Sequence, residues 1–525
     1  MRGAQAYTLA DLIRENARRF PLRTAVVCGS ERLTFPELRD ASMRAASALR
    51  DCGVGEGDRV AWFAQNCHRY LEALFGSAAL GATFVPLNWR SSSAELIRLL
   101  GDAAPKVVIS QRREIGDVIH AARATGAASQ ATWIDLDDDG PNGLPSRLAA
   151  ADADDPGVDV DDEGCAVRMY TAAFEGAPKG AQLTHRGLLA QNLAQIIAQG
   201  LTPDDGYLNT GPLFHIAGTM FLFAHLHVGG KNVMLPRVEG EETARLIHEE
   251  RVTSAMILPP SIPDVVEAAR NHGYDLSSLR TPGMTGTPEF EEWTRMTSRS
   301  KGIPAGYGQT EASGLVTLNL LAPEGTGAHG LTSHVAQLRI VDPEGHDVPA
   351  GQTGEIAVRG PLVMLGYAGD APEGSRLRGW RLCNDLGRRE ADGTITFIGP
   401  KTELIKSAAE NIYPTEVEIV LRAHDKVRDA CVIGVPDPVW GQSVKAVVEP
   451  VRGEQPTADQ LIAWCRERIA SYKKPRFVDI VDSLPRTSAG GVDRDAVKAQ
   501  HGGGGTVGAG SSRAEPLAVP SSDDR

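Results

Sequence analysis

Cysteine is scarce and widely scattered in this sequence. There are seven cysteines among 525 residues, an odd number, and no two of them have the C-x-x-C spacing of a zinc or redox motif. The sequence also lacks an apolar run long enough to span a membrane and an N-terminal segment with the apolar centre of a signal peptide. These absences argue against a disulfide framework, a cysteine-rich zinc site and a membrane-spanning helix, and we expect a soluble cytoplasmic protein.

Basic residues are also in the minority. The 54 lysines and arginines are outnumbered by 67 aspartates and glutamates, which gives a net charge of −13. An acidic chain is a poor partner for nucleic acid or for an anionic membrane, so we expect neither. Apolar residues make up 42% and charged residues 23%, which are values of a globular protein. The length predicts two or three domains and leaves the oligomeric state open.

The first part of the chain alternates short apolar stretches with amphipathic ones. This rhythm predicts an α/β fold with doubly wound, mostly parallel sheets. Helices are expected at residues 8–20, 36–52 and 181–199, and the expected strands include Arg59–Phe63, Lys106–Ser110, Thr132–Leu136, Val167–Thr171 and Val252–Leu258. Residues 335–368 alternate apolar and polar side chains, which predicts an antiparallel β region. Residues 379–400 are expected to form a strand, a turn at Asp385 and a second strand.

The pattern changes again near residue 400. We expect a large N-terminal domain over residues 1–398, a hinge at 399–403 and a small, mobile α+β domain at 404–500. Helices are predicted in this last domain at Asn411–Leu421, Thr457–Arg466 and Val492–Lys498. Residues 501–525 are rich in Gly and Ser and are expected to be disordered.

A glycine-flanked turn follows the expected strand at 167–171. Gly176-Ala177-Pro178-Lys179-Gly180 combines glycines, whose backbone conformation is unrestricted, with a lysine. Successive amides in such a turn can point inward and bind phosphate. Gly, Pro and Lys also make ordinary surface turns, and on this segment alone the ordinary turn is favoured.

The order of further motifs decides between these interpretations. Taken together, the motifs resemble those of the adenylate-forming ligases, which include acyl-CoA synthetases, the adenylation domains of peptide synthetases, and luciferases. The resemblance extends over nearly all of residues 8–498. It is carried by Leu33-Thr34-Phe35, Tyr170-Thr171 with Pro178-Lys179-Gly180, Pro212-Leu213-Phe214-His215, Tyr307-Gly308-Gln309-Thr310-Glu311, Gly354-Glu355-Ile356, Gly366-Tyr367, Gly379-Trp380 with Asp385, Glu410-Asn411-Ile412-Tyr413-Pro414, and Tyr472-Lys473-Lys474-Pro475.

The resemblance implies that an acid and MgATP form an acyl-adenylate, and that a nucleophile, often CoA, then takes the acyl group after the C-terminal domain rotates. It also implies roles for single residues. Glu311 would bind Mg²⁺, Thr310 the α-phosphate and Asp385 the ribose hydroxyls, while His215 would lie at the mouth of the acid pocket. The remaining nucleotide contacts would come from Thr171, Gly176, Lys179, Gly180, Thr285, Gly286, Thr287, Tyr307, Gly308 and Gln309, with Tyr307 stacked on adenine.

The sequence departs from the family pattern at four places. The Ser/Thr/Gly-rich run of the phosphate loop is Ala172-Ala173-Phe174-Glu175, which lacks hydroxyls and adds a negative charge. The late lysine that spans the acid and the α-phosphate is Gly491. A hinge arginine is Pro400, with Thr402 at the next charged position, and the glycine pair that lines the CoA tunnel is Ala408-Ala409.

Three functions therefore stay open. The first is an acyl-CoA synthetase with altered motifs. The second is a ligase with a different acceptor or acid, and the third is a non-catalytic protein on the same fold. The activated acid is expected to be small or aromatic, and the second function includes nitrite that is passed to an aryl amine. The retained Glu311, Thr310, Asp385, Tyr307 and Lys179 favour an active ligase. Met220, Phe221, Phe223, Leu258 and Ile262 are expected to make the acid pocket apolar. The alanines at the tunnel predict that free CoA is a poor acceptor.

Overall fold

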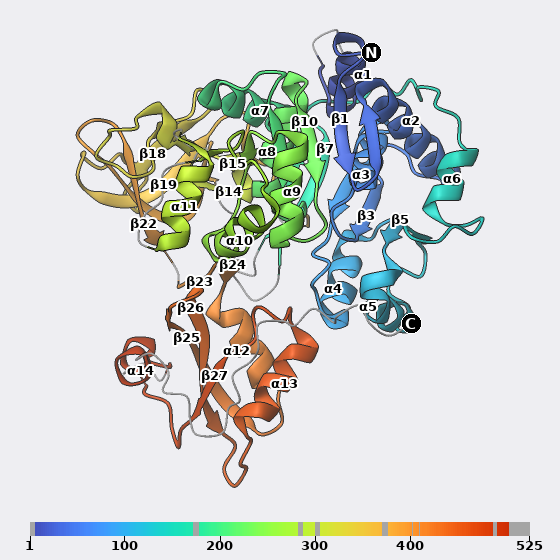
Figure 1. Ribbon diagram of the computed structural model, residues 1–525. Helices are drawn as coiled ribbons and strands as arrows, with labels where there is room; N and C mark the ends of the chain where they lie inside the picture. Colours follow the sequence, from blue (N-terminus) through green and yellow to red (C-terminus); the bar gives the residue numbers. More distant parts are fainter. Residues whose placement is uncertain are drawn as a thin grey trace. The chain divides into compact units, whose positions relative to one another are not determined.

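Figure 1 shows the computed structural model, in which a larger unit extends to Glu403 and a smaller unit begins at Leu404. Each unit has its own sheets and its own hydrophobic core. The structure describes residues 6–171, 178–281, 287–299, 305–369, 376–377, 379–401, 403–408, 410–486 and 491–502. The expected tail at 501–525 lies outside these ranges from residue 503 onward.

The first sheet of the larger unit is almost entirely parallel. Its strand order is β11-β9-β10-β1-β2, and only β2 runs antiparallel to its neighbour. The strands are β1 (Thr24–Cys28), β2 (Glu31–Thr34), β9 (Gly206–Asn209), β10 (Lys231–Met234) and β11 (Ser254–Ala255). The last strand is much shorter than the expected Val252–Leu258, and Pro259 begins a short 3₁₀ helix soon after it.

A second sheet has the order β6-β5-β3-β4-β7-β8 and is parallel except for β8. Its strands are β3 (Arg59–Phe63), β4 (Thr83–Pro86), β5 (Val107–Ser110), β6 (Thr132–Asp135), β7 (Cys165–Tyr170) and β8 (Gly180–Thr184). The expectation of a helix from residue 181 is wrong, because residues 180–184 pair with β7 in a hairpin. Helix α7 (His185–Gln199) begins where the Thr184 side chain accepts a hydrogen bond from the Gly187 amide.

Apolar side chains alternate between the two faces of each sheet. In β3, Val60 and Trp62 belong to one core, while Ala61 and Phe63 belong to another. Helices therefore cover both faces of both sheets, as in a doubly wound fold (Figure 1). The inner helices are α1 (Leu9–Arg19), α2 (Phe35–Asp51), α3 (His68–Ala79) and α8 (Ile216–Val228), and the outer ones are α4 (Ser93–Ala103), α5 (Arg112–Ala124), α9 (Gly240–Glu250) and α10 (Ile262–His272). A short helix, α6 (Leu144–Ala150), packs on α2.

The expected antiparallel region follows these two sheets. Its strands are β18 (Gln337–Val341), β19 (Thr353–Arg359), β20 (Arg376–Leu377), β21 (Trp380–Arg389) and β22 (Ile395–Pro400). Asp385 was expected at a turn, and this is wrong because β21 continues through it to Arg389. Asn384 has φ of +55° and an exposed side chain. This left-handed conformation is common in turns, so a residue of this kind inside a strand suggests a turn when only the sequence is known.

Short elements connect the sheets of the larger unit. They are helix α11 (Pro288–Met296) and the two-residue strands β12 (Arg280–Thr281), β13 (Ser298–Arg299), β14 (Gly308–Gln309), β15 (Gly314–Leu315), β16 (Thr317–Leu318) and β17 (Leu331–Thr332). Strands β14 and β15 form a tight antiparallel pair. A side chain on Gly308 would place its Cβ 2.2 Å from the Gly314 carbonyl oxygen, so this approach requires glycine.

The smaller unit is an α+β module with one mixed sheet. Its strands are β23 (Ile405–Ser407), β24 (Glu410–Ile412), β25 (Val427–Asp437), β26 (Gly441–Pro450) and β27 (Phe477–Ile480), and its helices are α12 (Pro414–Arg422), α13 (Ala458–Arg468) and α14 (Arg494–His501). The helix expected at Asn411–Leu421 starts later than predicted. Residues 410–412 pair with β23, and Pro414 opens the helix at its first turn.

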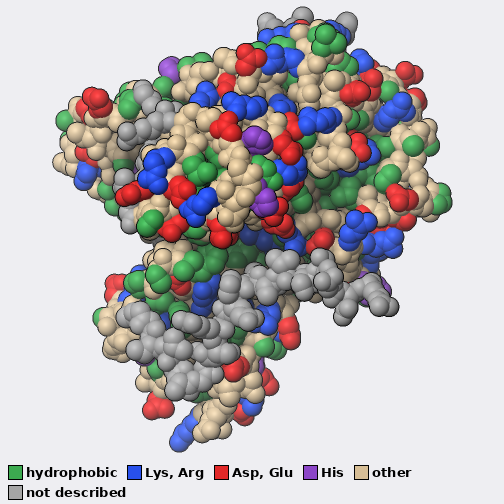
Figure 2. Space-filling model, viewed as in Figure 1, with side chains coloured by type: hydrophobic (Ala, Val, Ile, Leu, Met, Phe, Trp, Pro, Cys, Tyr) green, Lys and Arg blue, Asp and Glu red, His purple; other side chains and the backbone are tan. Residues whose placement is uncertain are grey.

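Acidic and basic side chains are interspersed over the face of the larger unit drawn in Figure 2. The excess of negative charge does not gather there into a patch of one sign. In the part of the chain that the structure describes, no helix is both long and apolar enough to cross a membrane.

Candidate active site

The β7–β8 hairpin carries the predicted phosphate loop between its two strands. Tyr170 pairs with Gly180, and the Thr171 amide donates a hydrogen bond to the Lys179 carbonyl oxygen at 3.0 Å. The base of the loop is thus an ordered continuation of the sheet. Residues 172–177, which include the expected phosphate ligand Gly176 and the anomalous Glu175, lie outside the described residues.

Residues 365–368 lie along the free edge of β8. The Gln182 amide donates to the Gly366 carbonyl, and the Ala368 amide donates to the Gly180 carbonyl. This pairing brings the Tyr367 ring beside the loop, where Lys179 Nζ lies 5.3 Å from its centroid. Such a distance is within the range of a cation–π contact.

Tyr367 also joins the phosphate loop to the buried carboxylate of Glu311. Its hydroxyl donates a hydrogen bond to Glu311 Oε1 at 2.5 Å. The Glu311 backbone is held as well, because its carbonyl accepts a hydrogen bond from the Met364 amide at 2.9 Å. Burial, followed by the Glu311 charge, raises the pKa of the Tyr367 hydroxyl above its ordinary value, so it stays a donor at neutral pH.

A third group centres on Asp385. Its Oδ2 atom accepts hydrogen bonds from the Tyr307 hydroxyl at 2.7 Å and from Gln309 Nε2 at 3.0 Å. The Tyr307 ring is buried and stacks on Phe397, with centroids 5.5 Å apart. Burial, then the neighbouring Cys383 and Asp385, raises the pKa of Tyr307 well above its ordinary value. Asp385 is therefore held by two neutral donors.

The Tyr307-Gly308-Gln309-Thr310-Glu311 segment is the physical link between these groups. Tyr307 and Gln309 point to Asp385, while Glu311 points to Tyr367. Thr310 and Glu311 lie in a 3₁₀ turn, with Thr310 half-buried. Gly308 is exposed. The structure thus brings together Thr171, Lys179, Gly180, Tyr307, Gly308, Gln309, Thr310, Glu311 and Asp385 within the larger unit.

The other expected site residues are less closely tied to this group. His215 precedes helix α8 and is half-buried, with its ring 5.6 Å from that of Phe214. Thr287 caps helix α11 and is exposed. Thr285 and Gly286 lie outside the described residues. The expected contacts of these residues with the acid and with adenine stay predictions.

Most of the side chains expected to line the acid pocket are buried. Met220, Phe221 and Phe223 are 4%, 3% and 0% exposed and belong to the core between the two sheets. Ile262 is 2% exposed and belongs to a separate core. Leu258, at 38% exposure, is accessible. Apolar character in the sequence did not separate packing residues from lining residues.

Sequence reasoning gave no role to Tyr367, although Gly366-Tyr367 was among the motifs, and it missed Arg381. The Arg381 guanidinium is 7% exposed and lies 5.3 Å from the centroid of the Tyr367 ring. Its Nη2 donates to the Tyr367 hydroxyl oxygen at 3.2 Å and is 3.9 Å from Glu311 Oε1. The signal in the sequence that could have pointed to Arg381 was a basic residue at a strand position that normally is apolar and buried.

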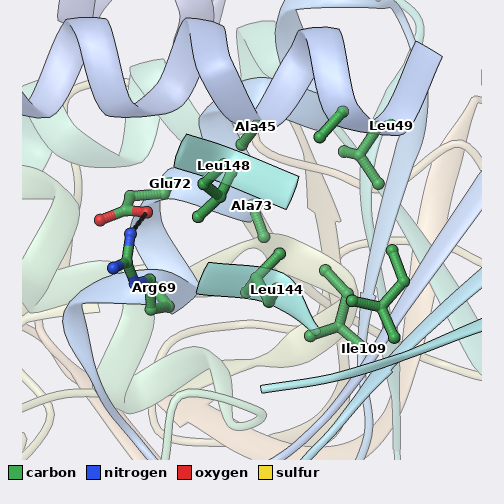
Figure 3. A pocket seen from close by; sticks show the side chains of 10 residues that line it. Ala45, Leu49, Arg69, Glu72, Ala73, Ile109, Leu144 and Leu148 are labelled. Carbon is green, nitrogen blue, oxygen red and sulfur yellow. Dashed lines mark hydrogen bonds and ion pairs between the residues drawn. The ribbon is translucent and has the colours of Figure 1, made fainter. Parts of the chain in front are cut away.

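A separate cavity lies between α2, α3, α6 and the second sheet, and Figure 3 shows its lining. Ala45, Leu49, Ile109, Leu144 and Leu148 make it largely apolar, and the Arg69–Glu72 ion pair closes one side at 2.7 Å. Its volume open to a water-sized molecule is about 10 Å³, which is room for about one water. It is too small for a substrate.

Comparison with known protein families agrees with this geometry. Residues 13–368 match the family described as AMP-binding enzyme, and residues 416–490 match the AMP-binding enzyme C-terminal domain. The chain belongs to the AMP-binding enzyme family, and it is an AMP-forming ligase that activates an acid with ATP.

Individual relatives span nearly the whole chain. It is 36% identical over 493 residues to a feruloyl-CoA synthase of Amycolatopsis sp, covering 93% of this chain and 97% of that protein. It is 34% identical over 503 residues to an indoleacetate–CoA ligase of Aromatoleum aromaticum, with the same coverage of both chains.

Solved structures give the same result. The amide bond synthetase McbA of Marinactinospora thermotolerans has a TM-score of 0.79 at 26% identity, covering 94% of this chain and all of that one. A variant of the o-succinylbenzoate CoA synthetase MenE of Bacillus subtilis also has a TM-score of 0.79 at 26% identity, covering 93% and 98%.

Proposed function

We propose that this chain converts an aromatic carboxylic acid and ATP to an acyl-adenylate and then transfers the acyl group to CoA. Two relatives that cover over nine-tenths of the chain are named for CoA ligases of feruloyl and indoleacetate groups, both of which carry an aromatic ring. The structural observation that carries the proposal is the Tyr367 side chain. It contacts Lys179 of the phosphate loop and the Glu311 carboxylate at once.

In this proposal the nucleotide lies along the Tyr307–Glu311 segment. Asp385 accepts the ribose hydroxyls, for which a carboxylate with two acceptor oxygens is suited. The Tyr307 ring borders adenine, with residues 285–287 on its other side. Thr171, Lys179, the loop glycines and Thr310 bind the phosphates, and His215 borders the acid.

Glu311 fits the role of a Mg²⁺ ligand. One of its oxygens accepts the Tyr367 hydrogen bond, and a carboxylate has further lone pairs for a cation. Within the described ranges, no group of three or more His, Cys, Asp or Glu residues could hold a metal ion. This agrees with Mg²⁺, which is commonly bound by one or two carboxylates together with substrate phosphates. The bound ion would neutralise phosphate charge.

The reaction then has two displacements. A carboxylate oxygen of the acid attacks the α-phosphorus of ATP, the bond from that phosphorus to the bridging oxygen breaks, and pyrophosphate leaves. The thiol of CoA next attacks the acyl carbon, loses its proton, and AMP leaves. The cationic Lys179 and the donor Thr310 would stabilise charge that develops on the phosphate oxygens in the first step.

A second candidate is a small oxyacid such as nitrite, passed to an aryl amine. It is favoured by the packing beside Gly314, the residue that follows the Tyr307–Ser313 segment. A Cβ at position 314 would lie 2.6 Å from Met220 Sδ and 3.2 Å from Gln191 Cδ. Both side chains are buried and fill space beside the site, which favours a short acid.

Pyrophosphate release from MgATP tests both candidates. The acids are aryl propenoic, aryl acetic and fatty acids and nitrite, each with CoA or an aryl amine, and products are identified by mass spectrometry. We expect pyrophosphate and an acyl-CoA with an aromatic acid; nitrite-dependent diazo formation would select the second candidate. Asp385→Ala is the control, since release that persists in it comes from another enzyme. No acid-dependent release from the wild type would contradict both candidates.

A further inference from the structure

Arg381 is a buried cation that the proposed nucleotide contacts leave without a role. It is the second residue of β21, and Arg381 and Cys383 are both buried. Such a position normally holds an apolar side chain, because burying a charge is costly unless it is compensated. An arginine there needs a reason in the chemistry around it.

The surroundings of the guanidinium are those of the proposed phosphate site. Lys179 Nζ and Arg381 Cζ each lie 5.3 Å from the centroid of the same ring, that of Tyr367. The Tyr367 hydroxyl accepts from Arg381 Nη2 at 3.2 Å and donates to Glu311 at 2.5 Å. Both cations therefore lie near the ring of one tyrosine, and the hydroxyl of that tyrosine contacts the carboxylate proposed to bind Mg²⁺.

The contact between Arg381 and Glu311 is an ion pair without a direct hydrogen bond. Nη2 and Oε1 are 3.9 Å apart, which exceeds hydrogen-bonding distance. Binding of a phosphate oxygen to the guanidinium would therefore not require a hydrogen bond to Glu311 to break. Its planar fork suits phosphate better than an ammonium group does, because two parallel N–H groups can bind two oxygens.

The charges of the sequence point the same way. The phosphate loop contains Glu175, and the family lysine at position 491 is a glycine. In the proposed site Lys179 is the basic side chain assigned to the phosphates, and the Glu311 carboxylate contacts the same tyrosine as Lys179 does. A further cation besides the Mg²⁺ proposed at Glu311 would strengthen polyphosphate binding, because negative charges close to the phosphates oppose it.

We propose that Arg381 is a catalytic residue that binds the phosphates of ATP and supplies, from within the larger unit, positive charge that the glycine at 491 does not. This inference rests on the proposed nucleotide site. It adds a residue of β21 to that site. It also predicts that part of the affinity for ATP is independent of a metal ion.

The test is calorimetric binding in excess EDTA, with ATP, pyrophosphate and adenosine as separate ligands. Arg381→Leu introduces an apolar side chain at the buried strand position. We expect it to weaken ATP and pyrophosphate binding by about tenfold or more, as expected for a lost charge-assisted contact, and to leave adenosine binding within about twofold of the wild type. The matched control is Arg359→Leu, since Arg359 is an exposed arginine of the neighbouring strand that stacks on Trp380.

Each other outcome has a definite meaning. Unchanged ATP binding in Arg381→Leu overturns the inference, and an equal loss of ATP and adenosine binding shows a structural role instead. If thermal unfolding shows that this variant is not folded, Arg381→Lys decides. This variant keeps the positive charge but lacks the two parallel N–H groups of the guanidinium. Wild-type affinity for ATP in Arg381→Lys would overturn the bidentate contact. Failure of the wild type to bind adenosine or MgATP would instead contradict the proposed function.

Discussion

The Tyr307 hydroxyl donates a hydrogen bond of 2.7 Å to Asp385 Oδ2, across a sequence separation of 78 residues. Gln309 Nε2 donates to the same oxygen and also to the Tyr307 hydroxyl oxygen at 3.0 Å. The two donors orient the carboxylate by contacts that do not involve a ligand. In the proposed function Asp385 is thereby pre-organised for the ribose, which lowers the entropic cost of binding.

Tyr307→Phe tests this orientation. The ring remains stacked on Phe397 while the hydroxyl donor is lost, and Gln309 still holds Asp385. We expect adenosine affinity to fall roughly three- to tenfold, because a hydrogen bond that orients the ribose-binding carboxylate contributes about 1 kcal/mol. Titration calorimetry with adenosine and 2′,3′-dideoxyadenosine measures the effect. An equal loss for both ligands would show that the hydroxyl does not act through ribose recognition.

Glu311→Gln should abolish MgATP-dependent pyrophosphate release and leave the protein folded. The amide keeps the shape and can still accept from Tyr367, but it removes the anionic ligand that Mg²⁺ prefers. We expect a fall in kcat of roughly a hundredfold or more. Steady-state kinetics over a Mg²⁺ series gives the result, with thermal unfolding as the control for folding. Wild-type turnover in this variant would remove Glu311 from the metal site.

Glu175→Thr examines the altered phosphate loop, whose residues 172–177 lie outside the described ranges. The change removes a negative charge and restores a hydroxyl where phosphates are proposed to bind. A tenfold lower dissociation constant for ATP would correspond to about 1.4 kcal/mol. Calorimetric affinity for ATP that equals the wild-type value would show that this loop does not contact phosphate.

Ala408→Gly tests whether the alanine restricts the acceptor. Ala408 has φ of +51°, a left-handed conformation that costs a residue with a Cβ roughly 1–2 kcal/mol and that glycine adopts freely. We expect the variant to be more stable and to form acyl-CoA faster, with pyrophosphate release unchanged. Ala128→Gly is the matched control, since Ala128 has φ of +50° in the larger unit. Equal thioester rates in wild type and Ala408→Gly would contradict a steric effect at the tunnel.

Stability is expected to fall in mildly acidic solution because of buried histidines. Burial lowers the pKa of His225 from 6.5 to about 4. The same holds for His68, His185 and His227. These rings are neutral in the folded chain at pH 6, whereas the unfolded chain takes up protons below pH 6.5. The free energy of unfolding should therefore decrease as pH falls from 6.5 toward 4.

His225→Phe provides the comparison, since the ring of His225 stacks on Tyr207. The variant keeps an aromatic ring and cannot take up a proton. We expect it to lose less stability than the wild type between pH 6.5 and 4 in denaturant titrations. Identical pH profiles for the two proteins would contradict a contribution from His225.

Much of the fold could be predicted because long elements repeat their pattern. The strands of the second sheet and helices such as α2 agree with the apolar periodicity. Local predictions were wrong where strand pairing or a local backbone conformation overrode that pattern: β8 pairs with β7 before α7 starts, β24 precedes Pro414, Asn384 lies inside β21 without ending it, and β11 ends at Ala255.

The site was predictable as far as its motifs are continuous. Tyr307, Gln309 and Glu311 come from one segment, and the structure gives them the partners Asp385 and Tyr367. The Arg381 side chain could not be assigned from sequence, because its contacts come from two other segments, at residues 311 and 367. Phe221, Phe223 and Ile262 are buried in cores, and their lining of the acid pocket stays a prediction, because an apolar side chain looks the same in the sequence whether it lines a pocket or fills a core.

A single carboxylate, that of Glu355, holds the chain close to the end of the larger unit. Glu355 accepts from the Asn384 amide at 3.1 Å and from Lys401 Nζ at 2.8 Å, and the Lys401 amide donates to the Asn384 carbonyl. The chain is thus anchored up to Lys401, and only positions 402 and 403 precede Leu404. Gly399 and Pro400 also pair with β21, so three positions of the expected hinge at 399–403 belong to the sheet structure of the larger unit.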